Sequence, residues 1–348
     1  MRKSAIALVA GAVVAGVAAG AIRFVLVPSQ EQVQSSTSQV EHYAGTASFL
    51  DQSAVASGDL AHAFATDVPF TADEVYKTVS LHGGTAVMSD TTTTTGPAAA
   101  VLGSGSSVWA VDRKTLLPAT PPAGSNVQAH QGLVVGFAFG PEKKDYPWWD
   151  SVTESQATAK YSGSEQRAGV STYVYEVDAK GPAKEQSIVA KLPTSIPQLM
   201  LKGLARQLGG AQAAALALVL PKDGSDVALT YVAETTTKTW IEQTTGETIE
   251  SQQTETVTAA MKTPVGEVPL TSVLTVKLNS TPAGVAADAK KAKDDDSKLM
   301  WLGTVLPAAL GALTLLLLVL AVLTGRRKPA AATAESAADE KSESSTSA

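Results

Sequence analysis

The stretch Leu229–Thr258, LTYVAETTTKTWIEQTTGETIESQQTETVT, decides the fold class of this 348-residue chain. Apolar and polar residues alternate from Leu229 onward, and threonine occupies every second position over much of Thr248–Thr258. Alternation at a period of two is typical of a β-strand, and branched or flat side chains fit its pleat. Gly246 can supply the positive φ that a tight connection needs. The stretch therefore predicts two long strands joined by a turn.

These two strands are longer than usual, and further strands are expected around them. Each runs for about a dozen residues, or ~40 Å at ~3.3 Å per residue. Ser272–Leu278 and Tyr173–Val177 show the same alternation. Long antiparallel strands usually bend, and closing them on themselves removes exposed edges. We therefore predict a mainly β fold, an elongated antiparallel β-barrel-like domain or a strongly curled sandwich.

An acidic residue followed three positions later by threonine recurs shortly after a tryptophan. It occurs as Asp112…Thr115, Asp150…Thr153 and Glu242…Thr245. We interpret these places as three strand–turn–strand units of similar build.

The two ends of the chain are apolar. Ala5–Val27 has one strongly polar residue, Arg23, and Leu299–Leu323 carries no charge. Either segment can cross a hydrocarbon core of ~30 Å as a helix. Basic residues precede the first segment and follow the second, so the positive-inside rule places both termini in the cytoplasm and the middle domain outside the plasma membrane.

Two points about these segments stay open. The basic start and small residues near Ala19 also fit a cleaved signal peptide, although the apolar run continues past that site. Small residues four apart in the first segment, and two alanines in the second, suit close packing of membrane helices. An alanine-rich composition would give the same pattern. The residues concerned are Ala12, Gly16, Gly20, Ala308 and Ala312.

One helix is expected within the β domain. Ser195 can cap it, Pro197 fits its first turn, and Gly209-Gly210 would end it. Its apolar stripe comprises Ile196, Leu199, Met200, Leu204 and Leu208. The predicted organisation is an N-terminal transmembrane anchor (1–27), an extracytoplasmic β domain (28–285, with a helical insertion at about 195–220), a charged stalk helix (286–298), a C-terminal transmembrane helix (299–324) and a disordered cytoplasmic tail (325–348).

The sequence offers little catalytic chemistry. It has no cysteine, and its four histidines lack metal-ligand spacing. Nucleophile-elbow, phosphate-loop and zinc-protease motifs are absent. No basic stripe with interleaved aromatics suggests nucleic acid. We expect neither an enzyme, nor a metal or other cofactor, nor a nucleic-acid partner.

The segment Gly136–Asp150, GFAFGPEKKDYPWWD, gathers aromatic residues and a lysine pair. It could form the rim of an apolar cavity, with the lysines placed for an anionic head group. We favour the alternative in which its aromatic side chains plug one end of a barrel, since aromatic residues lie mostly in cores. The candidate lipid-binding residues are Phe137, Phe139, Lys143, Lys144, Tyr146, Trp148 and Trp149, with Leu199, Met200 and Leu204 of the expected helix.

This segment resembles actinobacterial membrane proteins of the porin PorA family, and three other pieces of the chain agree. They are Arg23–Pro28, Thr239–Ile249 and Ala289–Leu299. The resemblance implies an elongated β-barrel domain with internal cavities and a projecting helix, held outside the plasma membrane. It also implies a role in assembling the lipoglycans lipomannan and lipoarabinomannan. The alanine- and leucine-rich stretch Ile196–Leu220 and the lack of cysteine depart from the family.

Three hypotheses for function follow. The first is a lipid-binding accessory protein that presents or moves a lipid of the phosphatidylinositol mannoside class. The second is a scaffold that recruits envelope glycosyltransferases. The third is a pore; it is the least favoured, because a spanning barrel needs an apolar outer band and these strands carry polar residues on their faces.

Overall fold

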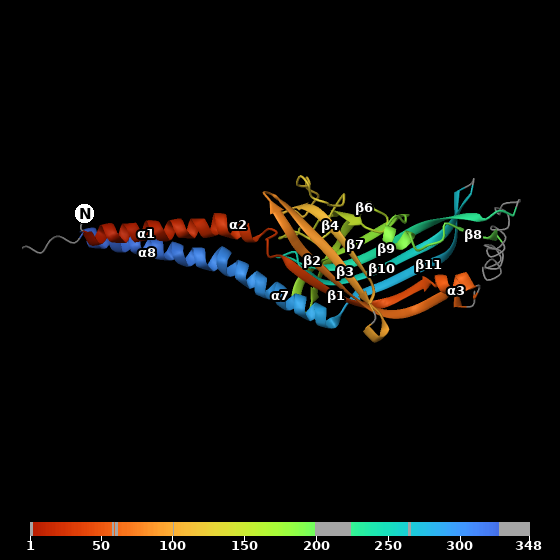
Figure 1. Cartoon of the computed structure of the whole chain (residues 1–348). Coiled ribbons are helices and arrows are strands. Elements are labelled where there is room, and N and C mark those ends of the chain that lie inside the picture. The colour runs from red at the N-terminus through yellow and green to blue at the C-terminus, as the bar shows by residue number, and fades with distance from the viewer. Residues whose placement is uncertain are drawn as a thin grey trace, which may run out of the picture. The chain divides into compact units, whose positions relative to one another are not determined.

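The computed structural model describes residues 3–57, 59, 62–99, 101–198, 224–263 and 266–326. These residues divide into two compact units, whose boundaries along the chain fall after Leu26 and after Met300. One unit is a pair of helices and the other is built on a β-sheet (Figure 1). The predicted helix over 195–210 falls mostly at residues 199–223, which lie outside the described residues.

The helical unit contains the two apolar segments at the ends of the chain. It comprises α1 (Lys3–Ala21), the π-helical turn η1 (Ile22–Leu26), the π-helical turn η4 (Trp301–Val305) and α8 (Leu306–Arg326). Ala12 and Ala15 of α1 and Ala321 of α8 are buried. A Cβ atom added to Gly11 would lie 3.4 Å from the Leu317 side chain. Small residues thus let α1 and α8 pack closely.

On α8, the predicted small-residue face was wrong. Ala308 and Ala312 are exposed, and the half-buried Thr314 and Leu317 lie with Ala321 on the side that faces α1. Helix crossing selects one stripe of α8, and that stripe is offset from the alanine pair.

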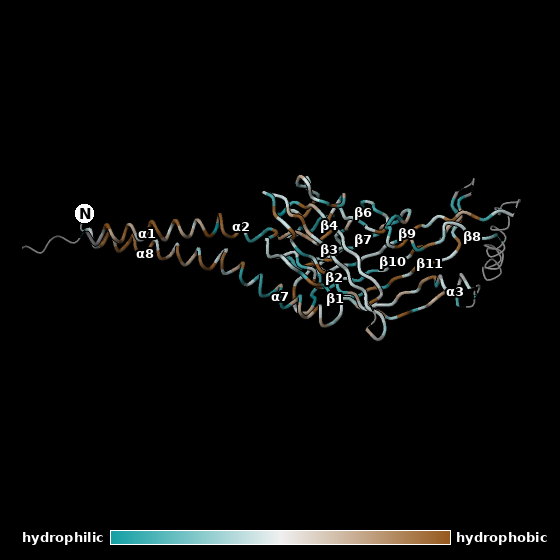
Figure 2. Tube along the Cα trace, in the orientation of Figure 1, coloured by the Kyte–Doolittle hydropathy of each residue, from teal (hydrophilic) through white to brown (hydrophobic). Residues whose placement is uncertain are grey.

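The surface of the helix pair is apolar. Val14 is 69% exposed and Leu315 is 66% exposed. Figure 2 shows hydrophobic residues along most of α1 and α8, whereas hydrophobic and hydrophilic residues are mixed along the strands. Ile6–Gln30 and Pro282–Arg326 are long and apolar enough to cross a membrane, judged by length and composition. Apolar side chains exposed around a helix pair are expected where the surrounding medium is lipid.

The second unit is one antiparallel sheet of eleven strands. The strand order is β4-β3-β2-β1-β11-β10-β9-β7-β6-β5, and β8 also pairs with β9. The strands are β1 (Ser38–Leu50), β2 (Phe64–His82), β3 (Thr85–Thr95), β4 (Val101–Asp112), β5 (Tyr146–Asp150), β6 (Ser155–Arg167), β7 (Val170–Pro182), β8 (Ser195–Ile196), β9 (Val227–Glu242), β10 (Thr248–Thr263) and β11 (Gly266–Ser280). The mainly β prediction is confirmed, including the long hairpin β9–β10.

The sheet curls into a half-barrel (Figure 1). Met88 and Trp109, from β3 and β4, share a hydrophobic core with Tyr175 and Ile241, from β7 and β9. These strands lie far apart in the strand order, so the sheet must bend to bring them together. We call the face that carries these residues the inner face, and the opposite face the outer face. Register shifts in the β1–β2 and β10–β11 pairs show bulges, which increase strand bending.

A short segment, residues 128–133, joins the two edge strands at one end of the sheet. Gln128 donates its backbone N–H to Val108 of β4 (2.8 Å), and Leu133 donates to Pro147 of β5 (2.9 Å). A Cβ atom on Gly132, which has φ +143°, would lie 2.8 Å from the backbone of β5. Only glycine lets the backbone at position 132 lie this close to β5 without displacing that strand. The edges are therefore bridged by a non-alternating loop and not by direct strand pairing.

The three acid–threonine turns have the similar build that the sequence predicted. In each, the acidic side chain accepts hydrogen bonds from the threonine N–H and hydroxyl. The N–H bonds measure 2.8 Å at Asp112, 2.9 Å at Asp150 and 2.5 Å at Glu242. Such bonds replace backbone partners where a strand ends. Gly246 has φ +75°, as expected for the turn after β9.

The remaining elements are short, except for one helix. They are α2 (Val27–Gln30), α3 (Gln52–Ser57), η3 (Pro97–Ala99), α4 (Gln186–Val189) and α7 (Pro282–Met300). Ala289 and Ala292 of α7 pack against Val170 and Ile249 of the sheet. Ser195, expected to cap a helix, lies in strand β8 instead, because it pairs with Ala228 of β9.

Candidate functional site

The predicted aromatic segment fills one end of the half-barrel. Phe137 is buried and stacks on Tyr175, with ring centroids 4.4 Å apart. Tyr146 meets Phe137 edge-on at 5.3 Å, and Trp148 lies 6.1 Å from it. The Tyr175 hydroxyl donates to the Glu142 carbonyl (2.6 Å), and burial raises the pKa of this phenol. This packing has the geometry of an aromatic plug.

The other side chains of the segment lie at its surface. Lys143 Nζ stands 5.6 Å from the Tyr173 ring centroid, and Lys144 Nζ stands 5.4 Å from that of Tyr146. Both lysines are exposed, and Lys144 also pairs with Glu142 at 3.1 Å. Phe139 is 37% exposed. Two exposed lysines, one of them ion-paired, thus stand beside an aromatic surface.

The structure brings together only part of the predicted site. Trp149, on β5, is half-buried and packs against the same core as Phe137. Leu199, Met200 and Leu204 lie outside the described residues. Of the predicted lipid-binding residues, the structure therefore brings together those of the aromatic plug, the two exposed lysines and the exposed Phe139.

Beyond the plug, the middle of the inner face is apolar and incompletely covered. Phe49 is 37% exposed, and four further side chains are half-buried. The strand registers place all of them on the inner face of β1, β2 and β11. The four are Phe70, Leu274, Val276 and Leu278. A concave surface of this kind can accept an apolar ligand.

Carboxyl groups interrupt this apolar surface, and sequence reasoning missed them. Glu41, Glu74 and Asp90 lie together on β1, β2 and β3, with Tyr43 and Tyr76 beside them. Burial, reinforced by the neighbouring carboxyls, raises the pKa of Glu41 and of Asp90 to about 8. Burial likewise raises the pKa of Glu74. Glu41 and Asp90 therefore hold protons near neutral pH.

A further carboxyl, that of Glu255, lies on β10 opposite Thr235 of β9. Burial raises the pKa of Glu255 to about 8, and the carboxyls of Glu185 and Asp150 add to the effect. The strict alternation of Thr254–Thr258 placed Glu255 on the same face as Val257. This alternation could have shown that Glu255 shares a face with an apolar residue. The sequence does not say that this face is the inner one.

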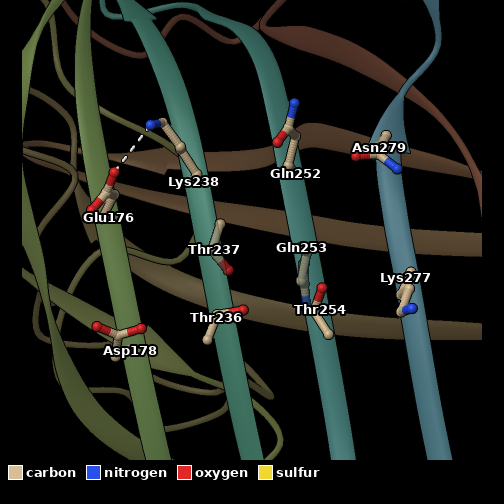
Figure 3. Close-up of a pocket in the computed structure, with 10 residues that line it drawn as sticks. All are labelled: Glu176, Asp178, Thr236, Thr237, Lys238, Gln252, Gln253, Thr254, Lys277 and Asn279. Atoms are coloured by element: carbon tan, nitrogen blue, oxygen red, sulfur yellow. Dashed lines mark ion pairs between the residues drawn. The ribbon is translucent and has the colours of Figure 1, made fainter.

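The outer face carries a polar groove of about 420 Å³ across β7, β9, β10 and β11 (Figure 3). Glu176 and Asp178 lie on one side of it, and Lys277 lies on the other. Lys238 pairs with Glu176 at 3.1 Å. Among the described residues, no aromatic side chain lines this groove, so they offer no stacking surface that would favour a sugar or a base.

Within the described residues, no group of three or more histidine and acidic side chains could hold a metal ion. His42 instead pairs with Asp73 at 2.6 Å, and His62 pairs with Asp59 at 2.8 Å. Both histidines are exposed.

Comparison with known proteins gives a family. A profile of the family described as Porin PorA matches residues 4–323, and no curated protein matches the chain. Among solved structures, the crystal structure of an acyl-CoA thioesterase II TesB2 from Mycobacterium marinum has a TM-score of 0.12 and 12% identity, over 70% of this chain and 80% of that chain. That similarity carries no argument about fold or activity. The match over nearly the whole chain, on a protein with two apolar helices and a β-rich unit, shows that this membrane protein belongs to the PorA porin family.

Proposed function

We propose that this protein is a non-enzymatic, lipid-binding accessory protein of lipomannan and lipoarabinomannan assembly. It presents or moves a phosphatidylinositol-type lipid on the outer side of the plasma membrane. The observation that carries the proposal is the half-exposed apolar surface on the inner face, around Phe49, Phe70 and Val276. Acyl chains would cover it and remove apolar area from water.

The head group of such a lipid would bind outside the half-barrel. In the described strands, lysines such as Lys160, Lys238 and Lys277 alternate onto the outer face, whereas the inner face carries carboxyls. An anionic phosphate would be repelled by those carboxyls if they ionised. Lys143 and Lys144, exposed beside the plug, are the cations we assign to it.

The membrane arrangement is part of the proposal. Both apolar helices span the plasma membrane, both termini are cytoplasmic, and the β unit faces outward. The basic residues Arg2, Lys3, Arg326, Arg327 and Lys328 support this orientation. Cysteine accessibility in intact cells, with single cysteines at Ser4 and at exposed Lys160 of this cysteine-free chain, tests it. Labelling of the Ser4 variant by an impermeant reagent would contradict the topology.

A pore is the second candidate, because the family is named for porins. The outer face argues against strands that span lipid. It carries the ion pairs Lys180–Glu234 at 3.2 Å and Lys238–Glu176 at 3.1 Å, all partly exposed. A lipid-facing band must be apolar. Ohmic channels in a planar bilayer with the full-length protein would revive this function.

Native mass spectrometry of the full-length protein, released from detergent, tests lipid binding. We expect a phosphatidylinositol-type lipid to co-purify and to bind again after delipidation. The Lys143→Ala/Lys144→Ala variant should bind it more weakly, whereas a Lys77→Ala/Lys160→Ala variant, also at exposed lysines, should not. If no lipid binds and glycosyltransferases crosslink to the β unit, the scaffold function replaces this proposal.

A further inference from the structure

Two polar side chains face each other on the inner face of β9 and β10. Thr235 and Glu255 occupy directly opposed positions of β9 and β10. Side chains at opposed positions of antiparallel strands have Cβ atoms about 5 Å apart. Thr235 is only 4% exposed. The pair therefore consists of a buried threonine and a half-buried glutamate at adjacent places on the inner face.

Both side chains have unused hydrogen-bonding capacity. Within the described residues, the Thr235 hydroxyl oxygen and Glu255 Oε1 are buried and have no hydrogen-bond partner. Leaving a buried polar atom unpaired costs on the order of 1–3 kcal/mol. Two such atoms, side by side on the same face, form a place where a ligand's polar group would recover that energy.

The surroundings decide which ligand fits. The register places the apolar Val276 beside Glu255 on β11, and the apolar Val257 follows on β10. On the other side, Thr237 and Gln253 are uncharged polar neighbours on the same face. The nearby charged groups are the acids Glu185 and Asp150. No described strand contributes a lysine or arginine to this face, as the registers show. An anion is therefore disfavoured, and an uncharged group that both donates and accepts hydrogen bonds is favoured.

We infer that Thr235 and Glu255 bind the hydroxyl group of an uncharged lipid whose acyl chains lie along the apolar inner face, a lipid of the diacylglycerol type. This inference rests on the proposed lipid binding and names a second, uncharged lipid class for the inner face, since in a phosphatidylinositol the same oxygen is esterified to phosphate. The ligand hydroxyl donates to one of the two side chains and accepts from the other.

Protonation of Glu255 matters for this role. Its pKa of about 8 leaves the carboxyl uncharged at pH 6–7, so it can donate as well as accept. Above pH 8 it ionises, and a buried carboxylate requires water that an apolar ligand would exclude. Affinity should therefore fall as pH rises from 7 to 9. The acids that face Glu255 are Asp150 and Glu185, and Glu41, Glu74 and Asp90 also titrate on the inner face.

The test uses the delipidated full-length protein in detergent micelles and native mass spectrometry. The probes are 1,2-dioleoylglycerol, its 3-acetyl ester, which lacks the hydroxyl, and dioleoyl phosphatidic acid, which adds an anion. Thr235→Val removes the hydroxyl at nearly constant shape. Thr236→Val is its matched control, since Thr236 is the next residue of β9 and is exposed on the outer face. Glu255→Gln keeps hydrogen bonding but cannot ionise.

We expect dioleoylglycerol to bind best and Thr235→Val to weaken it by about 3- to 10-fold, as for one lost neutral hydrogen bond. Thr236→Val should match the wild type. Glu255→Gln should bind dioleoylglycerol at pH 7, and its affinity should no longer fall between pH 7 and pH 9. That result would assign the pH dependence to Glu255 and not to the other titrating acids.

Equal binding of the acetyl ester, or an unchanged Thr235→Val variant, would overturn the inference while leaving lipid binding intact. Tighter binding of phosphatidic acid at this face, lost in Thr235→Val, would overturn it too. Failure to bind any of the probes or phosphatidylinositol would instead remove the proposed function itself.

Discussion

Replacing Glu41 by glutamine removes one of the three carboxyls that lie together on the inner face of β1, β2 and β3. Glu41 is only 8% exposed and lies directly opposite Glu74. Its side chain accepts hydrogen bonds from Gln39 (3.0 Å) and from the Tyr43 hydroxyl. A glutamine has the same shape, and its carbonyl oxygen can still accept from Tyr43. The substitution therefore removes the titration of this side chain and changes the packing little.

Burial, and then the neighbouring Glu74, raise the pKa of Glu41 from 4.5 to about 8. Between these values the folded protein keeps a proton that the unfolded chain has released. The folded state is therefore favoured most below pH 4.5, and stability falls as pH rises toward 8 and just beyond. At 1.36 kcal/mol per pKa unit, Glu41 alone costs about 3 kcal/mol between pH 5 and pH 8. Glutamine removes that cost.

Chemical denaturation of the full-length protein in detergent, followed by tryptophan fluorescence, measures the effect. Four of the five tryptophans lie in the β unit, at Trp109, Trp148, Trp149 and Trp240. We expect the wild type to lose stability from pH 5 to pH 8 and Glu41→Gln to lose markedly less. Glu234→Gln is the control, since Glu234 is exposed on the outer face. A wild-type stability that rises with pH, or an unchanged slope in Glu41→Gln, would refute this reasoning.

Three further substitutions test the packing. Gly132→Ala places a Cβ atom against the β5 backbone and should cost roughly 2 kcal/mol or more in unfolding free energy, whereas Gly124→Ala, also at positive φ but with nothing within 4 Å, should cost less. Asp150→Ala removes both bonds that close the β5–β6 turn and should lower the unfolding free energy by about 1–2 kcal/mol in the same assay. Ala12→Leu should disrupt the α1–α8 contact and lower the detergent melting temperature, whereas Val14→Leu, at an exposed position, should not; equal melting temperatures would contradict the packing.

The parts of the fold that follow from local chemistry could be predicted from sequence. An acidic side chain three residues before a threonine closes its own turn, so the turns at Asp112, Asp150 and Glu242 needed no tertiary information. Alternation is likewise enough to place Glu255 and Val257 on one face of β10, although neither residue was singled out from the sequence. The aromatic segment was recognised as unusual and was expected to plug the barrel, with the rim of an apolar cavity as the alternative. Burial of Phe137 against Tyr175 is what distinguishes a plug from a rim at that residue.

The bridging of the sheet edges could not be predicted, because residues 128–133 show neither alternation nor helical period. Their role depends on Val108 and Pro147, which lie on strands at opposite ends of the strand order. The same limit applies to α8. Its exposed Ala308 looks like a packing residue in sequence, but the crossing with α1 selects Thr314 and Ala321 instead.

By itself, the sequence determined that long antiparallel strands form, where three of their turns lie, and that both ends are apolar enough to span a membrane. Period, turn chemistry and hydropathy act over a few residues, so the chain states them directly. Only the tertiary structure decided which face of the sheet is inside, because that depends on how the whole sheet curls. The curl buries Glu41, Asp90 and Glu255 on an apolar surface, where desolvation raises the pKa of each carboxyl.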